Sequence, residues 1–290
     1  MAFPAFAEFD INNQRIQILA FNSLVDAQSL NQHSVNIIAS GPSVLEQTFS
    51  PEQLSRPTIF VNGSISLQSQ YDFDHVAGFV ISDARFISHQ QDILTSYYSG
   101  QPLFATAAVF EALAKLYPDM MFNYHSAMTL LFPVDRPWGV KANQTLFQKL
   151  NFKNTWLNRK KPLISFASDP NFVIDTNHKP APIGVSLDVT HGFIEAGTVA
   201  YVAAQLAFSK KAAAIHLFGI DLLNSAQPRF YENAKNQAPS KLEKAIYERI
   251  VPSFNLLGEV YQQHGVAVIN HSPISKDLFT SLKPEPLKWL

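Results

Sequence analysis

Short apolar runs alternate with amphipathic stretches along most of this chain. The apolar runs have the length of single strands and are rich in Val, Ile and Phe, which is typical of strands buried on both faces of a parallel sheet. They predict strands over 15–21, 35–40, 58–62, 78–81, 102–106, 120–124, 213–219 and 266–270.

The stretches between these runs predict helices over 84–97, 107–117, 194–209 and 240–264. The last one carries apolar residues three and four positions apart, as an amphipathic helix does. Pro252 lies inside it, so we expect a kink or a break there. Alternation of strands and helices predicts an α/β fold with a doubly wound, Rossmann-like and mostly parallel sheet.

Residues 132–182 do not follow this pattern. They contain six prolines and show only weak periodicity, which indicates a lid or insertion over the sheet. A chain of 290 residues is long enough for one large α/β domain with such a lid. We therefore expect a single domain over 1–290, with 132–182 as its lid.

Composition excludes several kinds of protein. The net charge is −1 and there is no basic block, which argues against binding to nucleic acid. The chain has no cysteine, so disulfides, thiolate zinc sites and a cysteine nucleophile are excluded. The histidines lack metal-ligand spacing, and we expect no metal. With no secretion signal or bilayer-length apolar run, we expect a cytoplasmic protein, and peripheral contact with the inner membrane stays open.

A small-residue elbow follows the apolar run at 35–40. Gly41 allows close approach of a ligand to the backbone, and Pro42 suits the first turn of a helix. Ser43 can cap that helix or donate to a phosphate oxygen, and Ser40 precedes the turn. The elbow therefore indicates a phosphate site, and the alternative is a strand-to-helix turn without a ligand.

Three further segments lie where strands end or helices begin. Asn62 ends the strand after the elbow and can bind a ligand there or cap the next helix. Gly197 and Thr198 are small enough for a helix to start against a nucleotide. Asp221 follows Gly219 at the end of a buried strand and is either a ligand group or a loop cap.

The order of these segments resembles the family 42 sialyltransferases. It is also similar to a related group, the third 3-deoxy-D-manno-octulosonic acid (Kdo) transferases of lipopolysaccharide core assembly. The resemblance implies a cytidine monophosphate (CMP) sugar as donor and no metal. It implies that the elbow and Asn62 hold the CMP, and that Gly197 and Thr198 meet its base or ribose near Gly219 and Asp221. It places the hydroxyl of Tyr231 on the leaving phosphate, where Arg229 can add charge.

The chain departs from this family at two places. Leu222 and Leu223 stand where the family has Phe-Tyr, and 238–241 lack the family's catalytic histidine. The general base is therefore open. His191 and His271 are the main candidates, because imidazole suits proton transfer at neutral pH, although each can instead be a structural histidine. The weaker candidates are His125, Asp188 and Glu195.

We expect a glycosyltransferase that moves a sugar from a CMP-sugar to a hydroxyl of a glycan or of the lipopolysaccharide core. Kdo is the favoured sugar and sialic acid the other choice. A rival function is a pterin pyrophosphokinase-like enzyme, which would need Asp83, Asp188 and Asp221 to converge on magnesium. A second rival is a non-catalytic nucleotide-binding protein that has kept the elbow and lost the base.

Overall fold

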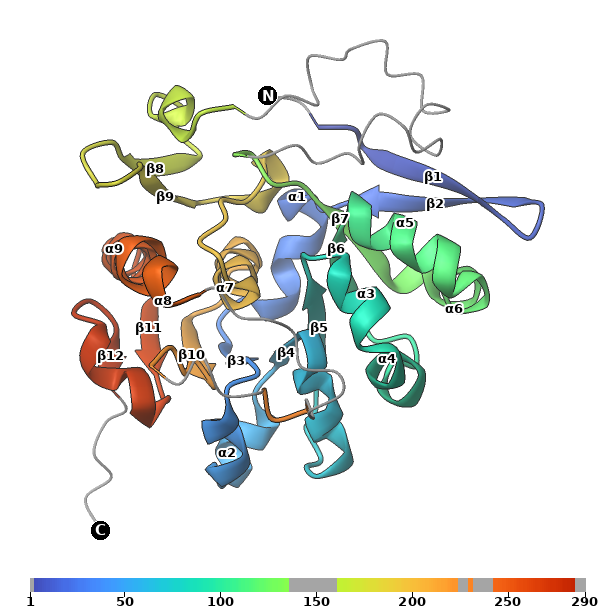
Figure 1. Cartoon of the computed structure of the whole chain (residues 1–290), viewed down its shortest axis with the longest axis horizontal. Coiled ribbons are helices and arrows are strands. Elements are labelled where there is room, and N and C mark those ends of the chain that lie inside the picture. The colour runs from blue at the N-terminus through green and yellow to red at the C-terminus, as the bar shows by residue number, and fades with distance from the viewer. Residues whose placement is uncertain (1–2, 136–160, 224–228, 232–241, 285–290) are drawn as a thin grey trace.

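One large sheet organises the computed structural model, which describes residues 3–135, 161–223, 229–231 and 242–284 (Figure 1). Within these residues the strand order is β1-β2-β7-β6-β5-β4-β3-β10-β11-β12. Every neighbouring pair is parallel except β1 and β2, which form an antiparallel hairpin. The α/β prediction is confirmed. The strands are β1 (Phe6–Ile11), β2 (Gln14–Ala20), β3 (Ser34–Ile38), β4 (Thr58–Val61), β5 (Val76–Ile81), β6 (Leu103–Thr106), β7 (Met128–Leu131), β10 (Ala214–Phe218), β11 (Ala267–Asn270) and β12 (Lys283–Pro284).

The order of the strands reverses beside β3. The chain adds β4, β5, β6 and β7 on one side of β3, and later returns to pair β10 with its other side. In open α/β sheets, ligands bind at such a switch point, outside the carboxyl ends of the strands. The segments that follow β3 and β10 are therefore the first place to look for a site.

Helices cover both faces of the sheet (Figure 1). α7 and α9 pack on one face, and α3 to α6 lie on the other. A separate two-stranded sheet, β8 (Phe172–Asp175) with β9 (Ile183–Ser186), lies next to α9. The helices are α1 (Ser23–Asp26), α2 (Pro51–Ser55), α3 (Arg85–His89), α4 (Gln91–Tyr97), α5 (Ala107–Leu116), α6 (Pro118–Tyr124), α7 (Val199–Ser209), α8 (Leu242–Ala245) and α9 (Val251–Gln263).

Burial on both faces explains the continuous apolar runs of the central strands. Ile37 and Leu217 point into the core under α7 and α9, whereas Phe60 and Phe218 point into the core on the opposite face. Burying each such side chain contributes about 1.5–3 kcal/mol. Successive side chains of a strand point to opposite faces of the sheet, and this alternation decides in which of the two cores a residue is buried.

The prediction of a strand over 120–124 is wrong. These residues belong to α6, which starts with Pro118 in its first turn, and the strand is β7, a few residues later. A short apolar run does not by itself distinguish a strand from a buried helical turn. The predicted helix over 84–97 is two helices, α3 and α4, separated at Gln90, which has φ −122° and ψ 52°.

The predicted helix over 240–264 contains an irregular turn. A π-helix, Ile246–Ile250, lies between α8 and α9, and Pro252 falls in the first turn of α9. The expected disruption near Pro252 therefore takes the form of a π-turn. Of the predicted lid, 136–160 lie outside the described residues, while its remainder includes a 3-10 helix, Leu163–Phe166, and β8. The lid and the single-domain organisation stay predictions.

Candidate functional site

Asp221 holds the elbow after β3 in place. Its carboxylate accepts the backbone N–H of Ser43 at 2.7 Å and the Ser43 hydroxyl at 2.7 Å. Both residues are buried. The turn after Gly41 is a short 3-10 helix, Pro42–Glu46. Asp221 thus anchors the elbow. This agrees with the second of the two roles expected for it, that of a loop cap.

Backbone contacts fix the segment that follows β10 against the elbow. The Gly41 N–H donates to the carbonyl of Gly219 at 3.0 Å, and the Ile220 N–H donates to the Ser272 hydroxyl at 2.6 Å. Gly219 has φ +70°, and a Cβ there would lie 2.4 Å from a methyl group of Val44. The amides of Gly41 and Ser43 thus both donate inside the protein.

Asn62 has the features of a ligand-binding residue. It directly follows β4, next to β3, and adopts φ +53°, a left-handed conformation that costs energy for a residue with a side chain. Its side-chain oxygen is buried and has no hydrogen-bond partner among the described residues. A buried acceptor without a partner costs about 1–3 kcal/mol, so a ligand donor at this position would be stabilising.

The ring of Tyr231 packs directly on the backbone beside Asn62. A Cβ added to Gly63 would lie 2.3 Å from this ring, so only glycine leaves room for it. Tyr231 also meets Phe86 edge-on, with ring centroids 6.5 Å apart, and the N–H of Phe230 reaches the Ser40 carbonyl at 3.4 Å. The structure therefore places the Phe230–Tyr231 pair next to Ser40 and Asn62. Arg229, which is half-buried, directly precedes this pair in the chain.

His271 lies in a cluster on one face of the sheet. Its ring stacks on Phe218 with centroids 4.3 Å apart, and its Nε2 lies 2.8 Å from Nδ1 of His216. The Arg56 guanidinium also donates to this Nδ1, at 3.1 Å, so Nδ1 is an acceptor and Nε2 of His271 is the donor. Burial, followed by the nearby Arg56 and His271, lowers the pKa of His216 to about 3. With Nε2 donating to His216, the basic nitrogen of the His271 ring is Nδ1, which is buried.

The other predicted bases lie away from the elbow. Asp188 accepts the hydroxyl of Ser23 at 2.6 Å and the N–H of Thr190 at 2.8 Å, and His191 ends the 3-10 helix that Asp188 caps. His125 precedes β7 and thus lies toward the amino ends of the strands, with its Nδ1 on the Phe122 carbonyl. No contact between described residues joins these groups to the elbow.

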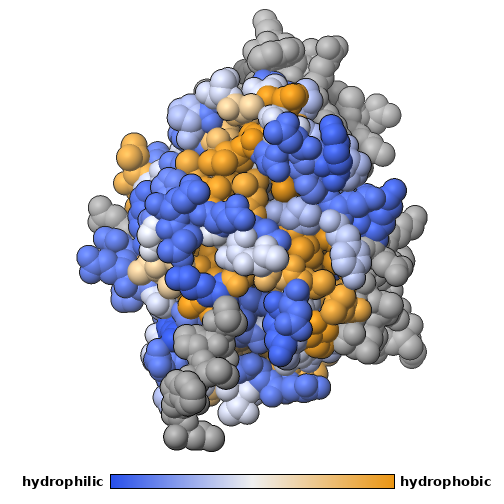
Figure 2. Space-filling view, turned by 90° about the vertical axis from the view of Figure 1, so that its left-hand side faces the viewer, coloured by the Kyte–Doolittle hydropathy of each residue, from blue (hydrophilic) through white to orange (hydrophobic). Residues whose placement is uncertain are grey.

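Gly197 and Thr198 form a second neighbourhood at the start of α7. A Cβ on Gly197 would lie 3.6 Å from Ile250 of the π-helix, and the carbonyl of Glu195 accepts a bond from Arg249. Arg249 also lines a cavity of about 750 Å³, on the side of the molecule that Figure 2 faces, where apolar surface is bordered by hydrophilic side chains. Its charged lining residues are Asp135, Lys161, Lys244, Glu248 and Arg249.

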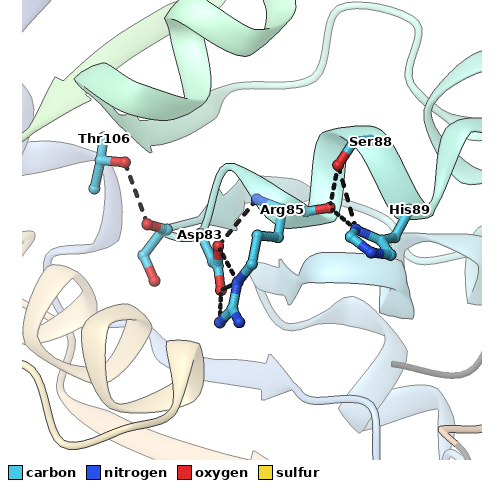
Figure 3. Close-up of polar contacts among 6 residues, drawn as sticks. Asp83, Arg85, Ser88, His89 and Thr106 are labelled. Atoms are coloured by element: carbon cyan, nitrogen blue, oxygen red, sulfur yellow. Dashed lines mark hydrogen bonds and ion pairs between the residues drawn. The ribbon is translucent and has the colours of Figure 1, made fainter. Parts of the chain in front are cut away.

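The sequence reasoning missed Arg85, which lies one strand beyond Asn62. In Figure 3 the Arg85 guanidinium faces the Asp83 carboxylate, with Nε 2.9 Å and Nη2 2.5 Å from Oδ2. The neighbouring strand adds Thr106, whose hydroxyl donates to the carbonyl of Ser82 at 3.2 Å. The Asp83 hydrogen bond and charge raise the pKa of Arg85. An Asp-x-Arg sequence directly after a predicted strand is the signal that could have revealed this pair.

The magnesium site of the rival pyrophosphokinase function is not supported. It requires Asp83, Asp188 and Asp221 to converge, whereas these carboxylates bind Arg85, Ser23 and Ser43 respectively. Within the described part of the chain, no group of three metal-ligating side chains gathers.

Comparison with known proteins decides the family. The family model described as 3-deoxy-D-manno-octulosonic acid transferase WaaZ matches residues 20–278. The chain belongs to this family. As a member of the WaaZ family it is a glycosyltransferase of lipopolysaccharide biosynthesis, which confirms the resemblance to the third Kdo transferases.

Two curated relatives carry the same description. The chain is 25% identical over 240 residues to a probable 3-deoxy-manno-octulosonic acid transferase of Escherichia coli K12, covering 80% of this chain and 77% of the relative. It is 36% identical over 74 residues to a protein of the same description from Salmonella typhimurium LT2, covering 26% and 27% of the two chains. No solved structure gives a significant match. Within the described residues, no helix combines the length and apolarity required to cross a bilayer.

Proposed function

We propose that this WaaZ-family protein transfers Kdo from CMP-Kdo to a hydroxyl of a saccharide in the lipopolysaccharide core. The observation that carries the location of the donor is the buried oxygen of Asn62, which has no partner among the described residues and lies beside Tyr231, at the carboxyl ends of the strands next to the switch point. The family match supports Kdo as the transferred sugar.

The side chains around Asn62 bind different parts of the donor. The oxygen of Asn62 accepts from an amino or hydroxyl group of the nucleotide. Ser40, Arg229 and Tyr231 face the phosphate, where donors stabilise the charge that develops as CMP departs. Gly41, Ser43, Gly219 and Asp221 act indirectly, because they hold the elbow that positions Ser40. Gly197 and Thr198, directly before α7, meet the base or ribose of the nucleotide, as the resemblance implies.

Ligand-dependent stabilisation tests the donor. A nucleotide at about one hundred times its dissociation constant stabilises the folded state by about 2.7 kcal/mol, which a thermal shift detects. We expect CMP to raise the melting temperature, and ATP with magnesium to leave it unchanged. Stabilisation by ATP with magnesium alone would reject a CMP-sugar donor. Binding of CMP without consumption of CMP-Kdo would favour the non-catalytic function.

Replacing Asn62 tests the site itself. Asn62→Ala should weaken CMP binding about five- to thirty-fold, because a hydrogen bond is worth roughly 1–2 kcal/mol. The matched control is Asn13→Ala, since Asn13 also has a left-handed backbone, φ +61°, but lies in the exposed turn between β1 and β2. Equal CMP affinity in Asn62→Ala and Asn13→Ala would show that the nucleotide binds elsewhere.

A further inference from the structure

The cavity of about 750 Å³ lies on the side of the molecule that Figure 2 faces, and no part of the donor is assigned to it. Cavities of about 300–1,000 Å³ are typical of sites that bind small ligands. Three segments form its wall together with Asp135, namely residues 161–164, residues 180–183 and one face of the helical segment 244–249.

Most of the side chains that line this cavity are apolar. They include Leu163, Ile164, Pro180, Pro182 and Ile183. An apolar lining with a few charged groups is typical of sites that hold a ligand by its apolar faces and fix its orientation through polar contacts. Of the five charged lining residues three are basic and two are acidic, so the lining carries a net charge of +1. This excess of positive charge favours an acidic ligand.

Arg249 offers hydrogen-bond donors to such a ligand. Its Nη2 donates to Oδ2 of Asp135 at 3.3 Å and to the carbonyl of Glu195, and Arg249 makes no other hydrogen bond or ion pair with the described residues. Because a guanidinium carries five N–H donors, three of them remain for a ligand. The Arg249 side chain is 46% exposed and that of Asp135 only 14%, so the guanidinium is the more accessible of the two groups.

The cavity adjoins the part of the chain that meets the donor in the proposed function. Arg249 belongs to the π-helix Ile246–Ile250, and π-turns inside helices are frequent at functional sites. It binds the carbonyl of Glu195, two residues before Gly197, and its neighbour Ile250 lies 3.6 Å from the position of a Cβ on Gly197. A ligand in the cavity would therefore lie next to the segment that is assigned to the nucleotide.

We propose that this cavity binds the acceptor saccharide and that Arg249 binds an acidic group of it, a carboxylate or a phosphate; this inference rests on the proposed function. The planar guanidinium matches both anions, because paired N–H groups can donate to two oxygens of either one. The apolar wall contacts the C–H faces of the sugar rings. Lys244, exposed and 3.7 Å from Glu248, adds a second positive charge beside the opening.

Calorimetry of a deacylated inner-core oligosaccharide binding to the full chain, without donor, tests the anion contact. Arg249→Gln should weaken this binding about tenfold or more and leave the dissociation constant of CMP within about threefold, because it removes the charge of the guanidinium. Arg249→Lys, which keeps the charge, should recover part of the loss. The matched control is Arg15→Gln, an exposed arginine that also pairs with carboxylates. Wild-type affinity in Arg249→Gln would overturn the contact.

A second pair of variants tests the cavity itself. Ala181 is exposed and lines the cavity, so the large side chain of Ala181→Trp should fill it without disturbing the core. We expect this variant to raise the KM of the acceptor about tenfold and to keep the wild-type melting temperature and CMP affinity. The control is Ala167→Trp, at an exposed position outside the lining, which should keep the wild-type KM. A wild-type KM in Ala181→Trp would show that the acceptor binds elsewhere.

The acidic group is identified by changing the oligosaccharide. If removal of its phosphates abolishes the effect of Arg249→Gln, the group is a phosphate, and if the effect persists until the carboxyl groups are reduced, it is a carboxylate. An equal effect on the fully neutral oligosaccharide would reject the ionic contact. If the wild-type protein neither binds CMP nor consumes CMP-Kdo, the proposed function fails, whereas oligosaccharide binding that depends on Arg249 and on the space beside Ala181 is measured without any donor.

Discussion

Replacing Asp221 should destabilise the protein through the elbow. Asp221→Ala removes the acceptor of both the N–H and the hydroxyl of Ser43, and both residues are less than 10% exposed. A hydrogen bond to a charged group contributes about 1.5–3 kcal/mol, so the two bonds together are worth about 3–6 kcal/mol. Because the loop can relax toward water, we expect the lower end of this range, about 3 kcal/mol.

A loss of about 3 kcal/mol corresponds to a fall of about 5 °C in the melting temperature of a chain of this size. Urea unfolding followed by circular dichroism gives the same quantity independently. Ser43→Ala should cost less, about 1–2 kcal/mol, since the backbone N–H keeps its acceptor. The control is Asp277→Ala, an exposed carboxylate in the 3-10 helix Pro273–Leu278, which also contains Ser275, the acceptor of the Leu222 N–H. A melting temperature of Asp221→Ala within 1 °C of wild type would refute the anchoring role.

Two further predictions concern packing and pH. Gly63→Ala should destabilise the fold by about 1–3 kcal/mol and weaken CMP binding, because its Cβ would displace the ring of Tyr231. In a Tyr231→Ala background this loss of stability should nearly vanish. Thermal melts of the wild type, the two single variants and the double variant check this. Burial raises the pKa of Glu111 to about 7, so the folded state holds a proton that the unfolded chain releases near pH 4.5. Stability from this proton is present below about pH 4.5 and is lost as pH rises through 7. Glu111→Gln should therefore gain up to about 2–3 kcal/mol over wild type between pH 5 and pH 8, and equal melting temperatures at pH 8 would contradict this.

The fold was more predictable from the sequence than the site. Seven of the predicted strands correspond to β2, β3, β4, β5, β6, β10 and β11, because buried parallel strands have a continuous apolar composition. The error at 120–124 arose where a run of apolar residues starts with Pro118 and Asp119, which are also favourable at a helix start. The β1–β2 hairpin supplies another strand that the apolar runs did not indicate.

For the site, sequence order placed residues at the correct edge of the sheet but did not show which face each side chain uses. Ser40, Asn62 and Tyr231 do meet near the switch point. His271 follows a strand as predicted, yet its ring stacks on Phe218 and binds His216 on one face of the sheet. The sequence left Asp221 as either a ligand group or a loop cap, and only the three-dimensional contact with Ser43 identifies it as an anchor.

The bond between Ser43 and Asp221 joins residues 178 positions apart, which has a consequence for synthesis of the protein. The first half of the proposed donor site leaves the ribosome long before its anchor does. A chain arrested before β10 lacks both the strand that completes the switch point and the carboxylate that holds the elbow. Donor binding is therefore a property that the nascent protein acquires late, and incomplete chains should not compete with the finished enzyme for its nucleotide sugar.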